Sequence, residues 1–277
     1  MATDVPLETG YGPGTPPGDN LCNDYAQNLA VAYRSLAQAR GDRLEVHNDL
    51  SLMLVDRGSP SEFGNIAVAR RPLGDREWQD AAERLHVFYS GQDGGPFLVF
   101  SAWTTPDLTG VDFGRIGHPP LMLRMPAPVA DRAIEGFEIR PVTDAASAEE
   151  WERAFVSGFP EPALQPFLPG SLLPERALNA TGWRHWIGYL DDRPVATASA
   201  YLASTHVDVE YVATLPSARG RGIGGAMTAQ ATLAASHVPA MLIASDLGRP
   251  VYERLGYRAL LRYTLWAGHR ASRRPSS

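Results

Sequence analysis

The chain has 277 residues, of which 44% are hydrophobic and 20% are charged, a composition that excludes fibrous, collagen-like and wholly disordered proteins. Its net charge of −6 argues against a broad binding surface for nucleic acid or an anionic membrane, so we expect neither as a partner. All 25 basic residues are arginine. This excludes chemistry that needs a lysine amine, including the Walker A phosphate loop.

Cysteine and histidine give no sign of a metal centre. The only cysteine is Cys22, so neither an intrachain disulfide nor a cysteine-rich zinc site can form. The seven histidines form no His-x-His or His-Glu-x-x-His spacing, and we expect no metal. Because residues 1–20 do not read as a signal peptide and no apolar run suits a membrane span, we expect a cytoplasmic protein.

The first half of the chain predicts alternating helices and short strands. Residues 1–20, rich in Gly, Pro and Thr, predict a flexible tail, and apolar residues at helical spacing predict a helix from Asn23 to Gly41. The next expected elements are strands at 44–47, 50–55 and 66–69, a helix from Asp75 to Gly91, and strands at 96–100 and 121–123.

A linker is expected at 127–136, after which the pattern restarts. Residues 160–174 hold five prolines and predict a long loop of the kind that lines a site, and 269–277 predict a second tail. The expected elements here are a strand at 137–142, a helix at 143–159, strands at 185–190, 195–202 and 207–214, a helix at 222–236, a strand at 240–244, a short helix at 250–255 and a strand at 258–266.

The order of helices and strands in 23–125 resembles that in 137–267, although the residues match poorly. The sequence therefore predicts two degenerate copies of one module in the α+β or α/β class. Each copy should be a mixed, mostly antiparallel sheet flanked by helices.

The most informative segment is a glycine-rich turn between a predicted strand and a predicted helix. Gly220 to Gly225 holds four glycines in six residues. A turn without side chains at a helix start offers free N–H groups and a partial positive charge to a polyphosphate. Arg219 and Arg221 can add charge-assisted hydrogen bonds. The glycine spacing does not fit a dinucleotide fingerprint, and a purely structural turn is the alternative.

Two motifs resemble the GNAT superfamily of N-acetyltransferases. Arg219-x-x-Gly222-x-Gly224 is similar to the acetyl-CoA pyrophosphate loop of that superfamily, and the segment 251–257 (Val-Tyr-Glu-Arg-Leu-Gly-Tyr) is similar to its closing Tyr-x-x-Leu-Gly-aromatic element. The segment 212–216 is also typical of what precedes the loop. The resemblance covers about residues 137–267, which makes 137–268 the expected catalytic domain. It makes 21–126 a degenerate GNAT-like lobe, as in tandem GNAT proteins.

The resemblance implies acetyl-CoA as co-substrate, bound where the predicted strands 207–214 and 241–244 splay apart. Main-chain groups of Val212, Ala213 and Thr214 would pair with the pantetheine arm. The residues expected to hold the pyrophosphate are Arg219, Gly220, Arg221, Gly222, Ile223, Gly224 and Gly225.

An acid and a base are implied as well, for direct attack of an amine on the thioester. Tyr252 stands where the superfamily commonly has its general acid, and the alternative is a packing role. Glu210 lies where some members place a base, with Asp208 behind it; the alternatives are a solvated residue or an arginine partner. Alternation along the strand would place on one face Val207, Val209, Tyr211 and Ala213, and on the other Asp208, Glu210 and Val212.

The expected activity is transfer of an acetyl group from acetyl-CoA to a primary amine of a small molecule or peptide. A non-catalytic acyl-CoA-binding or regulatory module is the alternative. Aminoglycoside-like antibiotics, polyamines, amino acids and protein N-termini all stay open as acceptors, as do a longer acyl group and either a monomer or a homodimer.

We expect one acetyl-CoA per chain, because the comparable turn in the first half, residues 70–75, is unsuited to phosphate. It has one glycine, Pro72 lacks an N–H donor, and Asp75 places a carboxylate near the helix start. The first lobe can then serve packing and wall one side of the substrate cleft.

Overall fold

The computed structural model describes residues 21–59, 64–90, 96–129, 133–159, 165 and 167–268. The tails expected at 1–20 and 269–277 lie outside these ranges, as do parts of the expected linker and of the Pro-rich loop. Within the described ranges, no helix is long and apolar enough to cross a bilayer.

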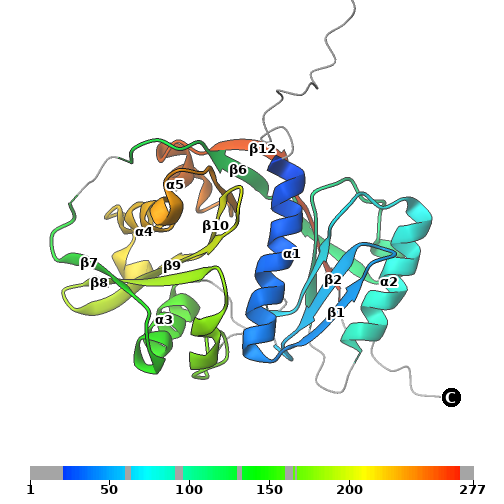
Figure 1. Ribbon diagram of the computed structural model, residues 1–277, viewed down its shortest axis with the longest axis horizontal. Helices are drawn as coiled ribbons and strands as arrows, with labels where there is room; N and C mark the ends of the chain where they lie inside the picture. Colours follow the sequence, from blue (N-terminus) through cyan, green and yellow to red (C-terminus); the bar gives the residue numbers. More distant parts are fainter. Residues whose placement is uncertain are drawn as a thin grey trace, which may run out of the picture.

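The first half holds two α-helices and six strands in the described part (Figure 1). They are α1 (Leu21–Arg40), β1 (Arg43–His47), β2 (Leu52–Asp56), β3 (Ile66–Ala69), α2 (Asp75–Tyr89), β4 (Phe97–Ser101), β5 (Phe113–Gly117) and β6 (Pro120–Arg124). Helix α1 ends where expected, because Gly41 takes a left-handed φ of +77° that stops the helix. Strand β5 was not predicted, since only one of its five residues is buried and the sequence shows no apolar alternation.

The second half follows the predicted order more closely. Its elements are β7 (Phe137–Pro141), α3 (Ala145–Gly158), β8 (Trp183–Leu190), β9 (Arg193–Leu202), β10 (Val207–Thr214), α4 (Ile223–Thr232), β11 (Ala240–Ile243), α5 (Arg249–Arg254), β12 (Arg258–Arg262) and β13 (Thr264–Gly268). Asp144 caps α3 by accepting the N–H of Ser147 at 2.8 Å.

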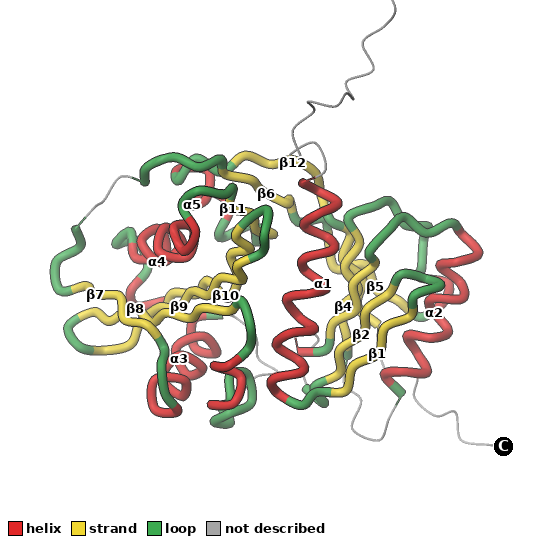
Figure 2. Tube along the Cα trace, viewed as in Figure 1, coloured by secondary structure: helices red, strands yellow, loops and turns green. Residues whose placement is uncertain are grey.

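The described strands form two mixed, mostly antiparallel sheets flanked by helices, which confirms the predicted fold class (Figure 2). The first sheet has the order β1-β2-β3-β4-β13-β5, and the second has the order β12-β6-β11-β10-β9-β8-β7. Each sheet contains a parallel pair, β3 with β4 in the first and β10 with β11 in the second.

The two sheets exchange strands, and this corrects the predicted boundaries at 126 and 268. Strand β6 comes from the first half but pairs with β11 and β12, and β13 comes from the end of the chain but pairs with β4 and β5. Segments 113–124 and 258–268 thus pair with each other through both sheets. The strand predicted at 258–266 is therefore two strands, separated at the fully buried Tyr263, where the chain passes between the sheets.

Helix α1 lies between the two sheets and is buried against both (Figure 1). Tyr25, Leu29 and Tyr33 pack in a cluster with residues of β2, β3 and β4, whereas Leu36 packs in the cluster around Trp151. The indole Nε1 of Trp183, on β8, donates to the carbonyl of Ala32 at 3.1 Å. Together with the strand exchange, these contacts make the two lobes one interlocked structure.

The end of the Pro-rich loop is fixed to α3 by one buried carboxylate. Glu152 is fully buried and accepts the N–H groups of Gly170 at 2.6 Å and of Leu172 and Leu173 at 2.5 Å each. Hydrogen bonds to a buried charged group are among the stronger ones in proteins. The clamp holds Leu172 in place beside the cavity described below.

We expect Glu152→Gln to lower the free energy of unfolding by about 2–4 kcal/mol, because the amide NH₂ would face N–H groups that need an acceptor. Urea unfolding followed by circular dichroism measures this. Glu149→Gln is the matched control on the same helix. Glu149 forms an exposed i,i+4 pair with Arg153, so its loss should cost less than about 0.5 kcal/mol. Equal costs for the two variants would contradict the clamp.

Candidate active site

Strands β10 and β11 splay apart in the second sheet. Their parallel pairing is limited to Val207 with Ala240 and Asp208 with Met241, while β10 continues to Thr214. Beyond Asp208, the edge of β10 that faces β11 is thus free of strand pairing. A cavity of about 490 Å³ is lined by residues 212–214 of this strand end, by the turn before α4, and by α5.

The glycine-rich turn lies at the N-terminus of α4, as predicted. Gly220 and Gly222 take left-handed φ values of +80° and +88°, which a side chain would strain. The first hydrogen bond of the helix runs from the N–H of Ala226 to the carbonyl of Gly222 at 3.1 Å. The N–H groups of 220–225 donate to no other described residue, so six successive donors lie at a helix N-terminus beside the cavity.

The two arginines of the turn differ in their contacts. Arg219 donates from Nε to the carbonyl of Thr214 at 3.1 Å and from Nη2 to the carbonyl of Gly158 at 2.9 Å, so it ties the turn to the ends of β10 and α3. Arg221 is exposed and hydrogen-bonds to no other described residue. A guanidinium has five N–H donors, which leaves both side chains with donors for an anion.

A second cavity of about 560 Å³ lies between the two lobes, and Glu210 lines it. The two cavities share four lining residues: Phe159, Val212, Ser245 and Tyr252. They therefore meet at the open end of the splay, beside the phenol of Tyr252. A molecule bound in one cavity can reach a molecule bound in the other at this point.

Tyr252 lies in the first turn of α5, where it lines both cavities and is 8% exposed. The bare backbone of Gly248 makes room for its ring, since a Cβ at Gly248 would lie 2.7 Å from a ring carbon. Burial raises the pKa of the Tyr252 phenol to about 12, with a smaller contribution from the negative charge of Glu210. The phenol thus keeps its proton at neutral pH.

Glu210 and Asp208 lie two residues apart on β10 with very different surroundings. Burial raises the pKa of Glu210 to about 7, opposed by a hydrogen bond from the Tyr33 hydroxyl at 3.4 Å. Asp208 is fully buried, and burial together with the charge of Glu210 raises its pKa well above the usual value. Burial thus disfavours the charged form of Asp208, whereas Glu210 titrates near neutral pH.

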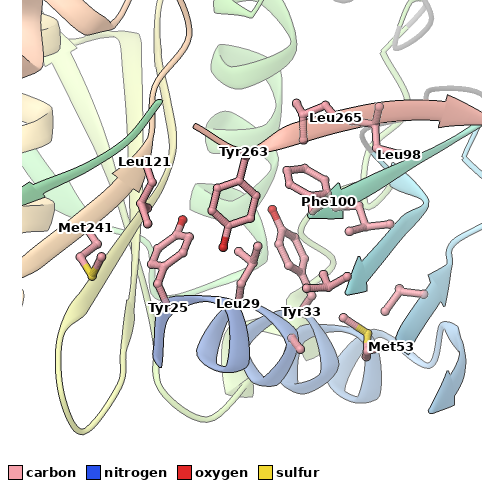
Figure 3. Packing of buried hydrophobic residues seen from close by; sticks show 14 of the residues in the cluster. Tyr25, Leu29, Tyr33, Met53, Leu98, Phe100, Leu121, Met241, Tyr263 and Leu265 are labelled. Carbon is pink, nitrogen blue, oxygen red and sulfur yellow. The ribbon is translucent and has the colours of Figure 1, made fainter. Parts of the chain in front are cut away.

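The pair faces three tyrosines from the lobe interface. Tyr25 and Tyr33 rise from α1, and Tyr263, at the crossing between β12 and β13, comes down between them (Figure 3). The rings of Tyr25 and Tyr263 pack edge to face with centroids 6.0 Å apart. Tyr33 was predicted only as part of the apolar face of a helix. Nothing in the local sequence indicates that its hydroxyl reaches a carboxylate 177 residues away.

A β-bulge corrects the predicted alternation along β10. Glu210 pairs with Ser199 and Ala213 with Thr197, so two residues, Tyr211 and Val212, oppose one on β9. Tyr211 takes a φ of +53° and packs its ring against Trp151 and Phe155, on the face opposite to that predicted. The bulge also exchanges the faces of Val212 and Ala213, as their core clusters show.

In the first lobe, the comparable helix start is occupied by the protein's own carboxylate. Glu77 accepts the N–H of Gly74 at 2.8 Å and pairs with Arg71 at 2.6 Å, which lowers the pKa of Glu77 to about 2. The residue that takes this place is thus Glu77 rather than the predicted Asp75. Strands β3 and β4 also stay paired over three residues, at 66–68. Among the described residues, no group of three or more His, Cys, Asp or Glu is arranged to hold a metal ion.

Comparison with known proteins supports the family that the motifs indicated. Residues 181–259 match the family model described as an acetyltransferase (GNAT) domain. The fold is similar to a GCN5-related N-acetyltransferase from Kribbella flavida, with a TM-score of 0.63 and 22% identity over 91% of this chain and 96% of that one. The fold is also similar to a GCN5-related N-acetyltransferase from Sphaerobacter thermophilus, with a TM-score of 0.52 and 13% identity over 89% of this chain and 93% of that one. No curated protein matches the sequence.

The matched region contains the splayed strands, the turn at the start of α4 and Tyr252, so the motif residues and the family match fall on the same structure. Residues 181–259 are thus similar to a GNAT acetyltransferase domain, and the fold is that of two GNAT-like modules that exchange strands.

Proposed function

We propose that this protein transfers an acetyl group from acetyl-CoA to a primary amine. The proposal is supported by the way two cavities meet. One lies beside a helix N-terminus suited to a pyrophosphate, the other contains the titratable carboxyl of Glu210, and Tyr252 lies where they join. The N–H groups of 220–225 would hold the pyrophosphate, with Arg221 as an additional donor. The unpaired edge of β10 at 212–214 would hold the pantetheine arm.

The proton steps use Glu210 as base and Tyr252 as acid. An amine enters as the ammonium ion, and the carboxylate of Glu210 accepts its proton, so that the nitrogen lone pair can attack the thioester carbonyl. The C–S bond breaks, the sulfur takes the phenolic proton of Tyr252, and the second proton of the nitrogen restores the Tyr252 phenol, while Glu210 gives up its proton to solvent. The products are an amide and a free thiol, with one proton released to solvent.

The coupling between the two groups favours this order of events. The charge of Glu210 raises the pKa of the Tyr252 phenol, so that Tyr252 is a weak acid while Glu210 is ionised. Once Glu210 has accepted a proton its charge is gone, and the pKa of Tyr252 falls. Tyr252 therefore becomes the better acid at the step that needs one.

The proposed base predicts a pH profile and a role for Tyr33. Because Glu210 accepts a proton only when ionised, kcat/KM should rise with pH through about 7 and then level off. Tyr33→Phe removes a donor that stabilises the ionised form, so this limb should move to higher pH, by roughly half a unit. Tyr25→Phe is the control, and a shift as large as that of Tyr33→Phe would contradict the role of Tyr33.

The function is tested by measuring thiol release from acetyl-CoA with a panel of amines, together with mass spectrometry of the products. We expect thiol and amide in equal amounts, and loss of both in Glu210→Gln. Binding of acetyl-CoA without release above hydrolysis for any amine would contradict the proposal and would indicate a non-catalytic acyl-CoA-binding module.

A further inference from the structure

Most of the wall of the interlobe cavity is apolar and comes from both lobes. The first lobe contributes Tyr33, Ile66, Phe100, Ile116 and Leu265, all from α1 and the first sheet. The second lobe contributes apolar and aromatic side chains of α3 and of the clamped loop, including Phe155 and Leu172. A ligand in this cavity would lie against hydrocarbon on both sides.

Two carboxyl groups and one guanidinium line the described part of the cavity, and they differ in exposure. Glu210 is the carboxyl group that lies among the apolar walls, where its side chain accepts a hydrogen bond from the Tyr33 hydroxyl. The other charged residues of the lining, Asp246 and Arg262, are exposed, and Arg262 donates to the carbonyl of His118 at 2.7 Å. Among the residues that the structure describes, the interior thus offers one counter-charge, while one carboxylate and one guanidinium lie at its solvent side.

We propose that the acceptor is an apolar monoamine, meaning a primary amine on an aliphatic or aromatic body without a second positive charge. This inference rests on the proposed function and narrows its acceptor. One ammonium group would pair with Glu210, and the body would lie between Ile66 and Phe100 on one side and Phe155 and Leu172 on the other. A polyamine or an aminoglycoside would bury further cations against apolar walls.

The first lobe would supply one wall of the acceptor site in place of a second cofactor site. Ile116 makes that contribution testable. It is 52% exposed and lines the cavity from the edge strand β5, so a polar substitution there should leave the fold intact. Val46, 37% exposed on the opposite edge strand β1, lines neither described cavity and is the matched control.

The first experiment measures kcat/KM for n-butylamine, n-hexylamine and n-octylamine, for phenethylamine, and for spermidine and kanamycin, with acetyl-CoA saturating. Burial of each added CH₂ should raise kcat/KM by about fourfold until the cavity is filled. We expect hexylamine and phenethylamine to exceed spermidine and kanamycin by at least about tenfold. A flat alkyl series, or a preference for the polycations, would overturn the inference and leave the acetyltransferase proposal standing.

The second experiment repeats the series with Ile116→Asp and with Val46→Asp. We expect Ile116→Asp to lower kcat/KM for hexylamine by about tenfold or more and to raise the relative rate with 1,6-diaminohexane, whose second cation then has a partner. Val46→Asp should match the unaltered protein, and calorimetric affinity for acetyl-CoA should be the same in all three. Equal behaviour of the two variants would overturn the wall assigned to the first lobe. No turnover of any amine by the unaltered protein would overturn this inference and the proposed function together.

Discussion

Tyr252→Phe should lower kcat by roughly 10²–10⁴-fold while leaving the affinity for acetyl-CoA nearly unchanged. The substitution keeps the ring that packs over Gly248 and removes only the hydroxyl group that would protonate the leaving sulfur. Rapid-quench measurement of a single turnover isolates the chemical step from product release. Calorimetry with acetyl-CoA gives the affinity independently.

Tyr257→Phe is the matched control for this prediction, five residues further along the same motif. Its hydroxyl contacts Thr232 Oγ1 at 2.6 Å in the core, and its side chain lines neither described cavity. We expect a lower free energy of unfolding for Tyr257→Phe, with little change in kcat. If single-turnover rates fell equally in both variants, or in neither, Tyr252 would be a packing residue.

Gly222→Val should weaken the binding of acetyl-CoA by about 100-fold or more. Gly222 has a φ of +88° at the start of α4, a conformation that costs a β-branched residue roughly 1–3 kcal/mol. A valine there would also place methyl groups beside the free N–H donors of the turn, where the phosphates would approach. Isothermal titration of the folded variant measures the loss.

Gly41→Val is the control that separates the effect of backbone strain from the loss of contacts with the ligand. Gly41 has a similar φ of +77°, ends α1, and lines neither described cavity. This variant should lose stability comparably and keep its affinity for acetyl-CoA. Equal losses of affinity in the two variants would mean that the turn at Gly222 acts through stability and not through contact with the ligand.

The sequence was sufficient where local chemistry decides the structure. Gly41 and Asp144 mark helix ends through backbone freedom and capping. The start of α2 was also found, although its N-cap is Gly74 and not the predicted Asp75. The turn at 219–225 was placed correctly at a helix start, because four glycines in six residues disfavour the interior of a helix or strand and favour a turn. These features depend on neighbours in the chain.

The sequence was insufficient where the outcome depends on distant partners. The exchange of β6 and β13 leaves no local signal, since each strand shows the same apolar pattern whichever sheet it joins. The bulge at Tyr211 was not predicted, because the alternation rule assumes a regular strand. The irregular backbone lets the ring of Tyr211 pack against Trp151 and Phe155. The bond from Tyr33 to Glu210 is a consequence of how the lobes interlock.

The two lobes would have different roles. The second lobe would bind the acyl donor and supply the acid and base, and the first lobe would close the acceptor cavity. In the first lobe, Glu77 accepts the N–H of Gly74 at the helix start and pairs with Arg71. The corresponding helix start of the second lobe presents free N–H groups instead. Two copies of a similar fold would thus yield one complete site.

Titration of acetyl-CoA into the full-length protein, followed by calorimetry, tests this division of roles most directly. We expect one binding site per chain in the unaltered protein and an affinity lowered by about 100-fold or more in Gly222→Val, with circular dichroism showing that the variant is folded. Two equivalent sites per chain, or a site that persists with full affinity in Gly222→Val, would contradict the assignment of acetyl-CoA to the turn before α4.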